Sequence, residues 1–173
     1  FELITNADGQ NISARHISIS TCGIVPKIYD LIEKHPQFTL SVSLHAPNNQ
    51  LRSQIMPVNK VWDVDELLKA CHTYTKATSR RISFEYAMMK GINDTDDCAR
   101  ELVNKLRGML CHVNLIPANE VRENDYTRSS DKRVIQFSDI LKAGGINVTV
   151  RRSLGGDIDA SCGQLRRSVK RGE

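Results

Sequence analysis

Residues 82–116 read ISFEYAMMKGINDTDDCARELVNKLRGMLCHVNLI, and this stretch decides the fold class. We predict a strand at residues 82–88 and another at residues 111–116. Between them, the run Asp94-Thr95-Asp96-Asp97 marks the start of a helix that reaches about Arg107, because acidic side chains favour the positive amino end of a helix. A strand, a helix and a strand in this order predict a βαβ unit with parallel strands.

The rest of the chain repeats this alternation, which predicts an α/β protein. Further strands are predicted at residues 15–20, 38–43 and 146–151, and further helices at residues 26–35, 63–74 and 130–143. Asp63 and Glu66 have the spacing of a capping box at the start of the second of these helices. An extended piece at residues 1–5, followed by a turn at residues 7–10, is expected to form an edge strand or hairpin.

Two arrangements of a parallel sheet fit this alternation. An open doubly wound sheet and an incomplete barrel both consist of consecutive βα units, and periodicity alone does not separate them. In both arrangements the carboxyl ends of the strands surround one mouth, where ligand-binding groups gather. An incomplete barrel would also leave the edge of its first strand unpaired.

Polar side chains occur where several predicted strands end. They lie in the runs Ser20-Thr21, Ser43-Leu44-His45 and Pro117-Ala118-Asn119. Hydroxyl, imidazole and amide groups at adjacent strand ends would form a small hydrogen-bonding pocket. The alternative is that these residues serve turns, helix caps or internal structure, and for Asn93-Asp94 a turn and cap is the favoured interpretation.

One cysteine lies in the glycine-bounded run GGDIDASCGQL at residues 155–165, after the last predicted strand. Glycines let the backbone bend, so we interpret the run as a loop that presents the thiol of Cys162. Asp157 and Asp159 disfavour a nearby thiolate, so Cys162 needs a specific partner to react. The alternative is a small core residue that ends a strand.

The other four cysteines, at positions 22, 71, 98 and 111, are scattered, and no pair has C-x-x-C spacing. A zinc or redox motif is therefore unsupported. No apolar run approaches the roughly 20 residues of a membrane span. No signal-peptide pattern is seen, so we expect a cytoplasmic protein without membrane contact. The start at Phe1 rather than at a methionine leads us to expect a fragment or a shortened chain.

Composition is that of one globular domain, since 40% of the 173 residues are hydrophobic and 25% are charged. The net charge of +4 is uneven, because residues 151–173 hold six basic and three acidic side chains. Such a patch is able to bind RNA phosphates, and the alternative is a solubilising terminus. Further candidates for phosphate contact are Arg128, Lys132, Arg133, Arg151 and Arg152.

Five runs together resemble one known family. They are SISTCGIVP at residues 18–26, SLHAPN at 43–48, GIND at 91–94, NLIPAN at 114–119 and DIDASCGQL at 157–165. In this order they resemble the carboxyl-terminal part of the radical S-adenosylmethionine RNA methyltransferases, which methylate carbon 2 of adenine in 23S rRNA and tRNA. Ser161 stands where alanine is expected, and Cys22 occupies a position that varies in the family.

The resemblance implies that residues 1–173 form the later portion of a partial (βα)6 barrel, with an active-site loop and basic tail at about residues 155–173. It implies that Cys162 is the catalytic residue and carries the methyl group as S-methylcysteine. It also implies a set of residues that help to bind S-adenosylmethionine. These are Ser20, Ser43, Leu44, His45 and Asn119.

The resemblance further implies cofactors and partners of a full-length protein. The cofactors are S-adenosylmethionine and a 4Fe–4S cluster, whose C-x-x-x-C-x-x-C ligand motif is absent from this chain and lies upstream in the family. The partners are 23S rRNA, tRNA and an external electron donor. We therefore expect no metal ligand here and no activity from the fragment alone.

Three other functions stay open. One is the paralogue that methylates carbon 8 of the same rRNA adenine and confers antibiotic resistance, which shares the cysteine loop. Another is a non-catalytic module that binds S-adenosylmethionine or RNA. A third is an unrelated barrel enzyme for a phosphorylated metabolite, although no glycine-rich phosphate loop is present.

Overall fold

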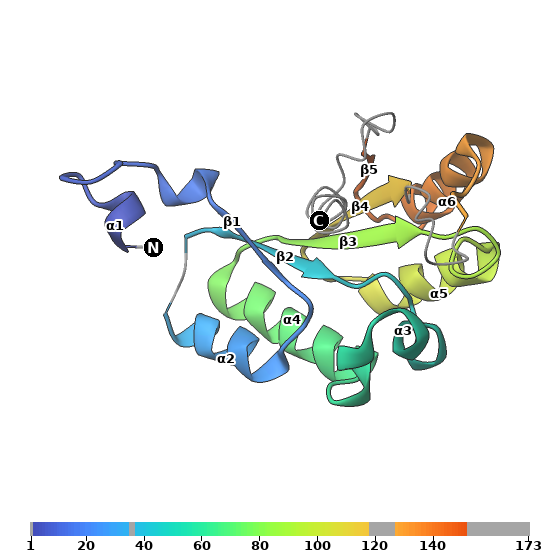
Figure 1. Cartoon of the computed structure of the whole chain (residues 1–173), viewed down its shortest axis with the longest axis horizontal. Helices are drawn as coiled ribbons and strands as arrows, with labels where there is room; N and C mark the ends of the chain where they lie inside the picture. Colours follow the sequence, from blue (N-terminus) through green and yellow to red (C-terminus); the bar gives the residue numbers. More distant parts are fainter. Residues whose placement is uncertain (1, 35–36, 118–126, 152–173) are drawn as a thin grey trace, which may run out of the picture.

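The computed structural model describes residues 2–34, 37–117 and 127–151. Their sheet has five strands, all parallel, in the order β1-β2-β3-β4-β5 (Figure 1). The strands are β1 (Ser18–Thr21), β2 (Thr39–Ser43), β3 (Ile82–Met88), β4 (Cys111–Pro117) and β5 (Val148–Val150). The predicted α/β class with parallel pairing is therefore confirmed.

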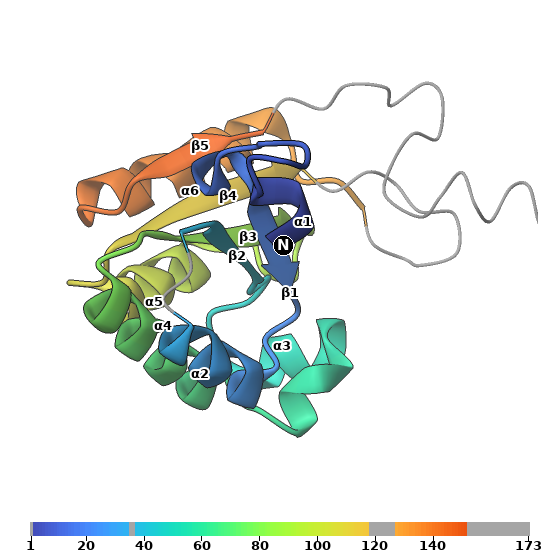
Figure 2. The same ribbon diagram turned by 90° about the vertical axis from the view of Figure 1, so that its left-hand side faces the viewer.

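Four helices connect the strands and lie on one side of the sheet (Figures 1 and 2). They are α2 (Val25–Glu33), α4 (Val64–Thr78), α5 (Asp96–Leu106) and α6 (Asp131–Ala143). A doubly wound sheet would carry helices on both faces and would reverse its strand order at a switch point. The sequential order and the single helical layer therefore identify part of a barrel, as the family resemblance implies.

Alternation along β3 explains how one face is covered. Ile82, Phe84, Tyr86 and Met88 are buried in one core cluster with apolar side chains of the four helices. The ring of Tyr86 lies 5.3 Å from that of Phe137 in α6. Successive strand residues point to opposite faces, so the register places every second residue of the neighbouring strands on the other face.

The face away from the helices, called the polar face below, is mostly polar. The residues that the register places on it are Ser18, Ser20, Thr39, Ser41, Ser43, Ser83, Glu85, Ala87, His112, Asn114, Ile116 and Thr149. Most of these side chains are half-buried or exposed. The sheet thus has an apolar face that carries the core and a polar face that is free to line a cavity.

Local signals place most helix ends as predicted. Asp63 and Glu66 form the predicted capping box of α4, with the Asp63 carboxylate accepting from the backbone N–H of Glu66 at 2.8 Å. Thr95 caps α5, and Ser130 caps α6. The predicted cap at the acidic run and the predicted helix at residues 130–143 are therefore confirmed within one or two residues.

Three predictions of local structure were wrong or incomplete. Residues 2–5 form the short helix α1 (Glu2–Thr5) instead of an edge strand, because Asn6 N–H donates to Glu2 C=O at 2.8 Å and closes a helical turn. Residues 14–16 form the 3-10 helix η1 (Ala14–His16), so β1 begins at Ser18.

A third element was not predicted at all. The helix α3 (Asn49–Ile55), capped by Asn48, and the 3-10 helix η2 (Pro57–Lys60) follow the carboxyl end of β2. In the part of the chain that the structure describes, no helix is both long enough and apolar enough to cross a membrane.

Candidate active site at the carboxyl ends of the strands

The predicted binding residues of β1 and β2 meet at one edge of the sheet. Ser20 pairs in register with Ser41, and Ser43 lies two residues further along β2 on the same polar face. Ser20 is exposed and Ser43 is half-buried. The two hydroxyls therefore stand at the carboxyl ends of neighbouring strands, as the sequence predicts, and are able to donate and accept hydrogen bonds there.

Leu44 and His45 continue from Ser43 but play different parts. The side chain of Leu44 is buried in the core, and its backbone N–H donates to Glu85 C=O at 3.0 Å. Its isobutyl group therefore packs in the core, on the helix-covered face of the sheet. Of the two residues, only His45 presents a polar side chain at this edge.

His45 is held in one tautomer by its surroundings. It adopts a left-handed backbone conformation with φ of 59°, and its Nδ1 accepts from the backbone N–H of Ala87 at 3.0 Å. Burial, and secondly the charge of Arg52, lower the pKa of His45 to about 4, with Glu85 opposing the shift. A neutral ring whose Nδ1 accepts carries its proton on Nε2, so His45 offers a fixed Nε2–H donor at neutral pH.

Asn93 lies in a turn, as predicted for the run Asn93-Asp94, whereas the helix cap predicted there is made by Thr95. Oδ1 of Asn93 accepts from Met89 N–H, and its Nδ2 donates to the carbonyls of His45 and Ala87, all at 2.7 Å. Tyr86 Oη donates to the Asn93 carbonyl at 2.7 Å. Every polar group of this buried side chain is thus used to join the turn after β3 to the strand end at His45.

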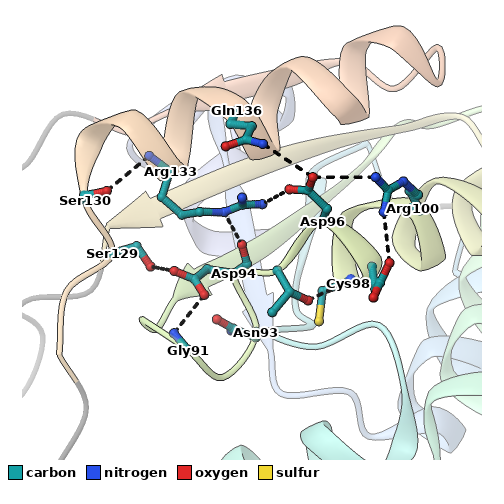
Figure 3. Close-up of polar contacts among 12 residues, drawn as sticks. Gly91, Asn93, Asp94, Asp96, Cys98, Arg100, Ser129, Ser130, Arg133 and Gln136 are labelled. Atoms are coloured by element: carbon teal, nitrogen blue, oxygen red, sulfur yellow. Dashed lines mark hydrogen bonds and ion pairs between the residues drawn. The ribbon is translucent and has the colours of Figure 1, made fainter.

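Asp94 links the same turn to the start of α6, as Figure 3 shows. Its carboxylate accepts from Gly91 N–H and from the hydroxyl of Ser129, both at 2.8 Å. Arg133 of α6 donates to the Asp94 carbonyl and pairs with Asp96, the first residue of α5. Arg133, a candidate for RNA contact from sequence, is therefore engaged within the protein.

Described residues lie on both sides of the segment that carries Asn119. Residues 118–126 lie outside the described residues, and with them Asn119. On one side β4 ends at Pro117, and on the other Lys90 N–H donates to Thr127 C=O at 3.0 Å. The predicted role of Asn119 stays a prediction.

A carboxylate on the polar face was missed by sequence reasoning. Oε1 of Glu85 accepts from Ser41 at 2.8 Å and from Ser83 and Asn114 at 3.1 Å each. Asn114 Oδ1 in turn accepts from the hydroxyl of Thr149 at 2.9 Å. The network spans four strands, and the alternation in I-S-F-E-Y-A-M at residues 82–88 was the signal that would have placed Glu85 on this face.

The cysteines divide by burial. Cys71, Cys98 and Cys111 are buried, and burial raises the pKa of Cys71 to about 12 and that of Cys111 to about 11. These two are inert thiols at neutral pH. Cys22 is exposed, and Cys162 lies outside the described residues. Within the described ranges, no three His, Cys, Asp or Glu side chains gather as a metal site would require.

The donor set at this edge fits S-adenosylmethionine in chemical type. Serine hydroxyls and an Nε2–H donor are able to bind a carboxylate, a ribose or a ring nitrogen of adenine. The hydroxyls belong to Ser20 and Ser43, and the ring to His45. Three of the five predicted binding residues therefore stand at one edge with polar side chains, while Leu44 is able to contribute only through its backbone.

Comparisons with known proteins agree with this geometry, although no protein-family model matches the chain. The chain is 52% identical over 166 residues to the Thermoanaerobacter sp. strain X514 protein named "Probable dual-specificity RNA methyltransferase RlmN", covering 96% of the chain and 48% of that protein. A second such protein, from Clostridium novyi, is 51% identical over 170 residues and is covered to 50%. The chain thus spans about half the length of the curated relatives it matches.

Solved structures give the same result. A radical SAM methyltransferase from Sphaerobacter thermophilus superposes with a TM-score of 0.89 at 47% identity, covering 93% of the chain and 47% of that protein. A domain of a pyruvate-formate lyase-activating enzyme from Bacteroides vulgatus has a TM-score of 0.66 at 15% identity, covering 87% of the chain and 88% of that domain, and so shares the fold alone.

Proposed function

We propose a function for this chain from one premise: it belongs to the family of radical SAM dual-specificity RNA methyltransferases, and it spans about half the length of those relatives. In a protein of their length, the chain supplies the later strands of the barrel and part of the pocket for S-adenosylmethionine. The whole protein then methylates carbon 2 of adenine in 23S rRNA and tRNA.

One observation carries this proposal. Ser20, Ser43 and His45, which come from two strands and lie up to 25 positions apart in the sequence, stand at the same edge of a barrel-type sheet. Their hydroxyl and imidazole groups suit S-adenosylmethionine, which is abbreviated as SAM in the name of the Sphaerobacter protein. Carboxyl strand ends are where barrels bind ligands, which supports a pocket at this edge.

The residues divide the work in the proposed pocket. The hydroxyls of Ser20 and Ser43 bind polar groups of S-adenosylmethionine, His45 donates from Nε2, and Asn119 adds an amide. Leu44 contributes its backbone and shapes the floor. When bound, S-adenosylmethionine supplies the methyl group and a 4Fe–4S cluster supplies the electron, with cluster ligands that come from outside this chain.

Cys162 carries the methyl group in this proposal. Its thiolate attacks the methyl carbon, so that a sulfur–carbon bond forms as the methyl–sulfonium bond breaks and S-adenosylhomocysteine leaves. Residues of about 155–173, which lie outside the described residues, form the loop that brings the sulfur to the mouth and a basic tail for RNA. A cytoplasmic location and an external electron donor belong to the same proposal.

Analysis of RNA from cells tests this function. The protein, extended to the length of its relatives, is expressed in bacteria that lack their own enzyme, and the modified adenine in 23S rRNA and tRNA is identified by mass spectrometry. We expect 2-methyladenine, lost in the variant Cys162→Ala and retained in the control Cys22→Ala. A methyl group at carbon 8, or no modification, would refute the proposal. Peptides that contain Cys162 should carry one additional methyl group.

A further inference from the structure

Arg52 of α3 lies beneath the candidate site and is fully buried, with 0% of its surface exposed. Its Nη2 donates to the carbonyls of Cys22 at 2.7 Å and Ser43 at 3.0 Å, and its Nε donates to the carbonyl of Leu44 at 3.1 Å. Its Nη1 donates to Oδ1 of Asn59 at 3.2 Å. One guanidinium group therefore joins the segments that follow β1 and β2.

Shape explains why an arginine occupies this position. The planar guanidinium presents donors in a fixed fork, so a single group reaches three carbonyls on two strand ends, which the point charge of lysine does not. Gly23 leaves room for it, since a Cβ at Gly23 would lie 3.2 Å from Arg52 Nη2. Gly23 also has a φ of 101°, a conformation that favours glycine.

The charge of Arg52 has no carboxylate partner in the part of the chain that the structure describes. Its four acceptors are all neutral oxygens, and the ion pairs of the described residues involve other side chains. A buried charge without a counter-ion is costly, so a purely structural tie would be better made by a neutral group. The charge of Arg52 therefore makes the electrostatic potential more positive at the carboxyl edge of the sheet, where the candidate site lies.

The pKa of His45 depends on that potential. The charged groups that act on its ring are Arg52 and Glu85, and they act in opposite directions. Burial is the larger cause of the neutral ring, and Arg52 adds to it by disfavouring the imidazolium form, while the hydrogen bond from Ala87 N–H to Nδ1 leaves the proton on Nε2. The same potential favours a negatively charged ligand group at the mouth.

We propose that Arg52 is a positioning residue: it holds the strand ends that carry Ser20, Ser43 and His45 in one arrangement, and its charge, which has no carboxylate partner among the described residues, attracts an anionic ligand group to this edge. The ligand part rests on the proposed function, in which the anionic group is the carboxylate of S-adenosylmethionine. The positioning part concerns the protein alone.

Two variants separate the effect of the planar guanidinium donors of Arg52 from the effect of its charge. Arg52→Lys keeps a positive charge but loses most of the fork. Asn59→Asp keeps the fork and places a carboxylate beside it, because Oδ1 of Asn59 already accepts from Arg52. Arg107→Met is the matched control, since Arg107 is exposed at the end of α5, away from this edge.

The first measurement is NMR titration of the His45 ring in the full chain, assigned with a His45→Gln variant. Asn59→Asp is expected to raise the His45 midpoint by roughly 1 pH unit, because it cancels a nearby positive charge. Arg52→Lys and Arg107→Met are expected to leave the midpoint near that of the parent. An unchanged midpoint in Asn59→Asp would overturn the role of the charge.

The second measurement is calorimetric binding of S-adenosylmethionine to the protein extended to the length of its relatives. Arg52→Lys is expected to weaken binding about tenfold, the equivalent of one lost charged hydrogen bond, while circular dichroism shows a retained fold. Asn59→Asp should also weaken it. Parent-like affinity of Arg52→Lys would overturn the positioning role. Absence of binding by the parent would instead refute the proposed function, and the His45 titration would still decide the role of the charge.

Discussion

The two faces of this sheet are built from the same strands but differ in the polarity and burial of their side chains. On β3, Phe84 and Tyr86 are fully buried against helices, whereas Ser83 and Glu85, which alternate with them, are half-buried on the polar face. Parallel sheets are usually covered on both faces, and their strands are then apolar throughout. Here alternate residues divide the tasks, so that one face supplies stability and the other supplies a polar lining.

The polar face is held by hydrogen bonds rather than by packing. Glu85 collects donors from β2, β3 and β4 on one carboxylate oxygen. Half-buried hydrogen bonds contribute less to stability than buried apolar side chains, because water replaces them when they break. Substitutions on the two faces should therefore differ in size, which provides a direct test of this comparison.

The largest effect is expected on the helix-covered face. Phe84→Ala should lower the free energy of unfolding by about 3–5 kcal/mol, because it opens a cavity in the core. Urea denaturation measures the change, and Ser83→Ala at the adjacent position is the control, expected below about 1 kcal/mol. Equal losses in the two variants would contradict the division of tasks.

The next effect depends on pH and on His45, which joins the strand ends to the polar face through Ala87. The folded pKa of about 4 lies below the ordinary value of 6.5, so the unfolded chain binds more protons between these values. His45 therefore stabilises the fold fully above pH 6.5 and loses this contribution as the pH falls to about 4.

We expect this loss to be on the order of 3 kcal/mol, measured as the difference in pH dependence of the free energy of unfolding between the parent and His45→Gln in urea denaturation. Parallel pH profiles of the parent and His45→Gln would refute the assignment.

A smaller effect is expected from the centre of the polar face. Glu85→Leu should lower the free energy of unfolding by about 1–2 kcal/mol, since three donors lose their acceptor and water replaces it in part. Glu85→Gln keeps an accepting oxygen and should lose less. A stabilised Glu85→Leu protein would mean that the face tolerates apolar covering, against the proposed cavity lining.

The smallest effect is expected at the exposed end of the same network. Thr149→Val removes the hydrogen bonds of Thr149 with Asn114 and His112, both at an exposed position, and should change the free energy of unfolding by about 0.5–1 kcal/mol. Val148→Ala is the comparison, since Val148 packs against the core from the other face of β5 and should cost more. A larger loss of stability in Thr149→Val than in Val148→Ala would contradict the difference between the two faces.

Sequence reasoning performed best where one local signal sufficed. The strand at residues 82–88 matches β3 at both ends, and the capping box of Asp63 and Glu66 is present. It failed where a local pattern was weak. Residues 2–5 form a helix where the sequence predicts an extended piece. The sequence does not predict α3, because its seven residues, NQLRSQI, carry too short an apolar stripe.

The candidate site shows the same limit. Ser20, Ser43 and His45 were predictable because they end strands. The hydrogen-bond partners of Arg52 and Glu85 were not, since they lie up to 44 positions away in the sequence. A lone arginine on an unrecognised helix gives no local sign that it will be buried beneath two strand ends.

The sequence by itself determined the βα alternation, the helix caps and the family resemblance, because these depend on neighbouring residues and on ordered motifs. The tertiary structure confirmed the partial barrel that the resemblance implies, and it alone decided which face of the sheet is polar and where Arg52 places its charge. Those features depend on strand order and on contacts between segments that are distant in the sequence. A pattern of neighbouring residues does not show such contacts.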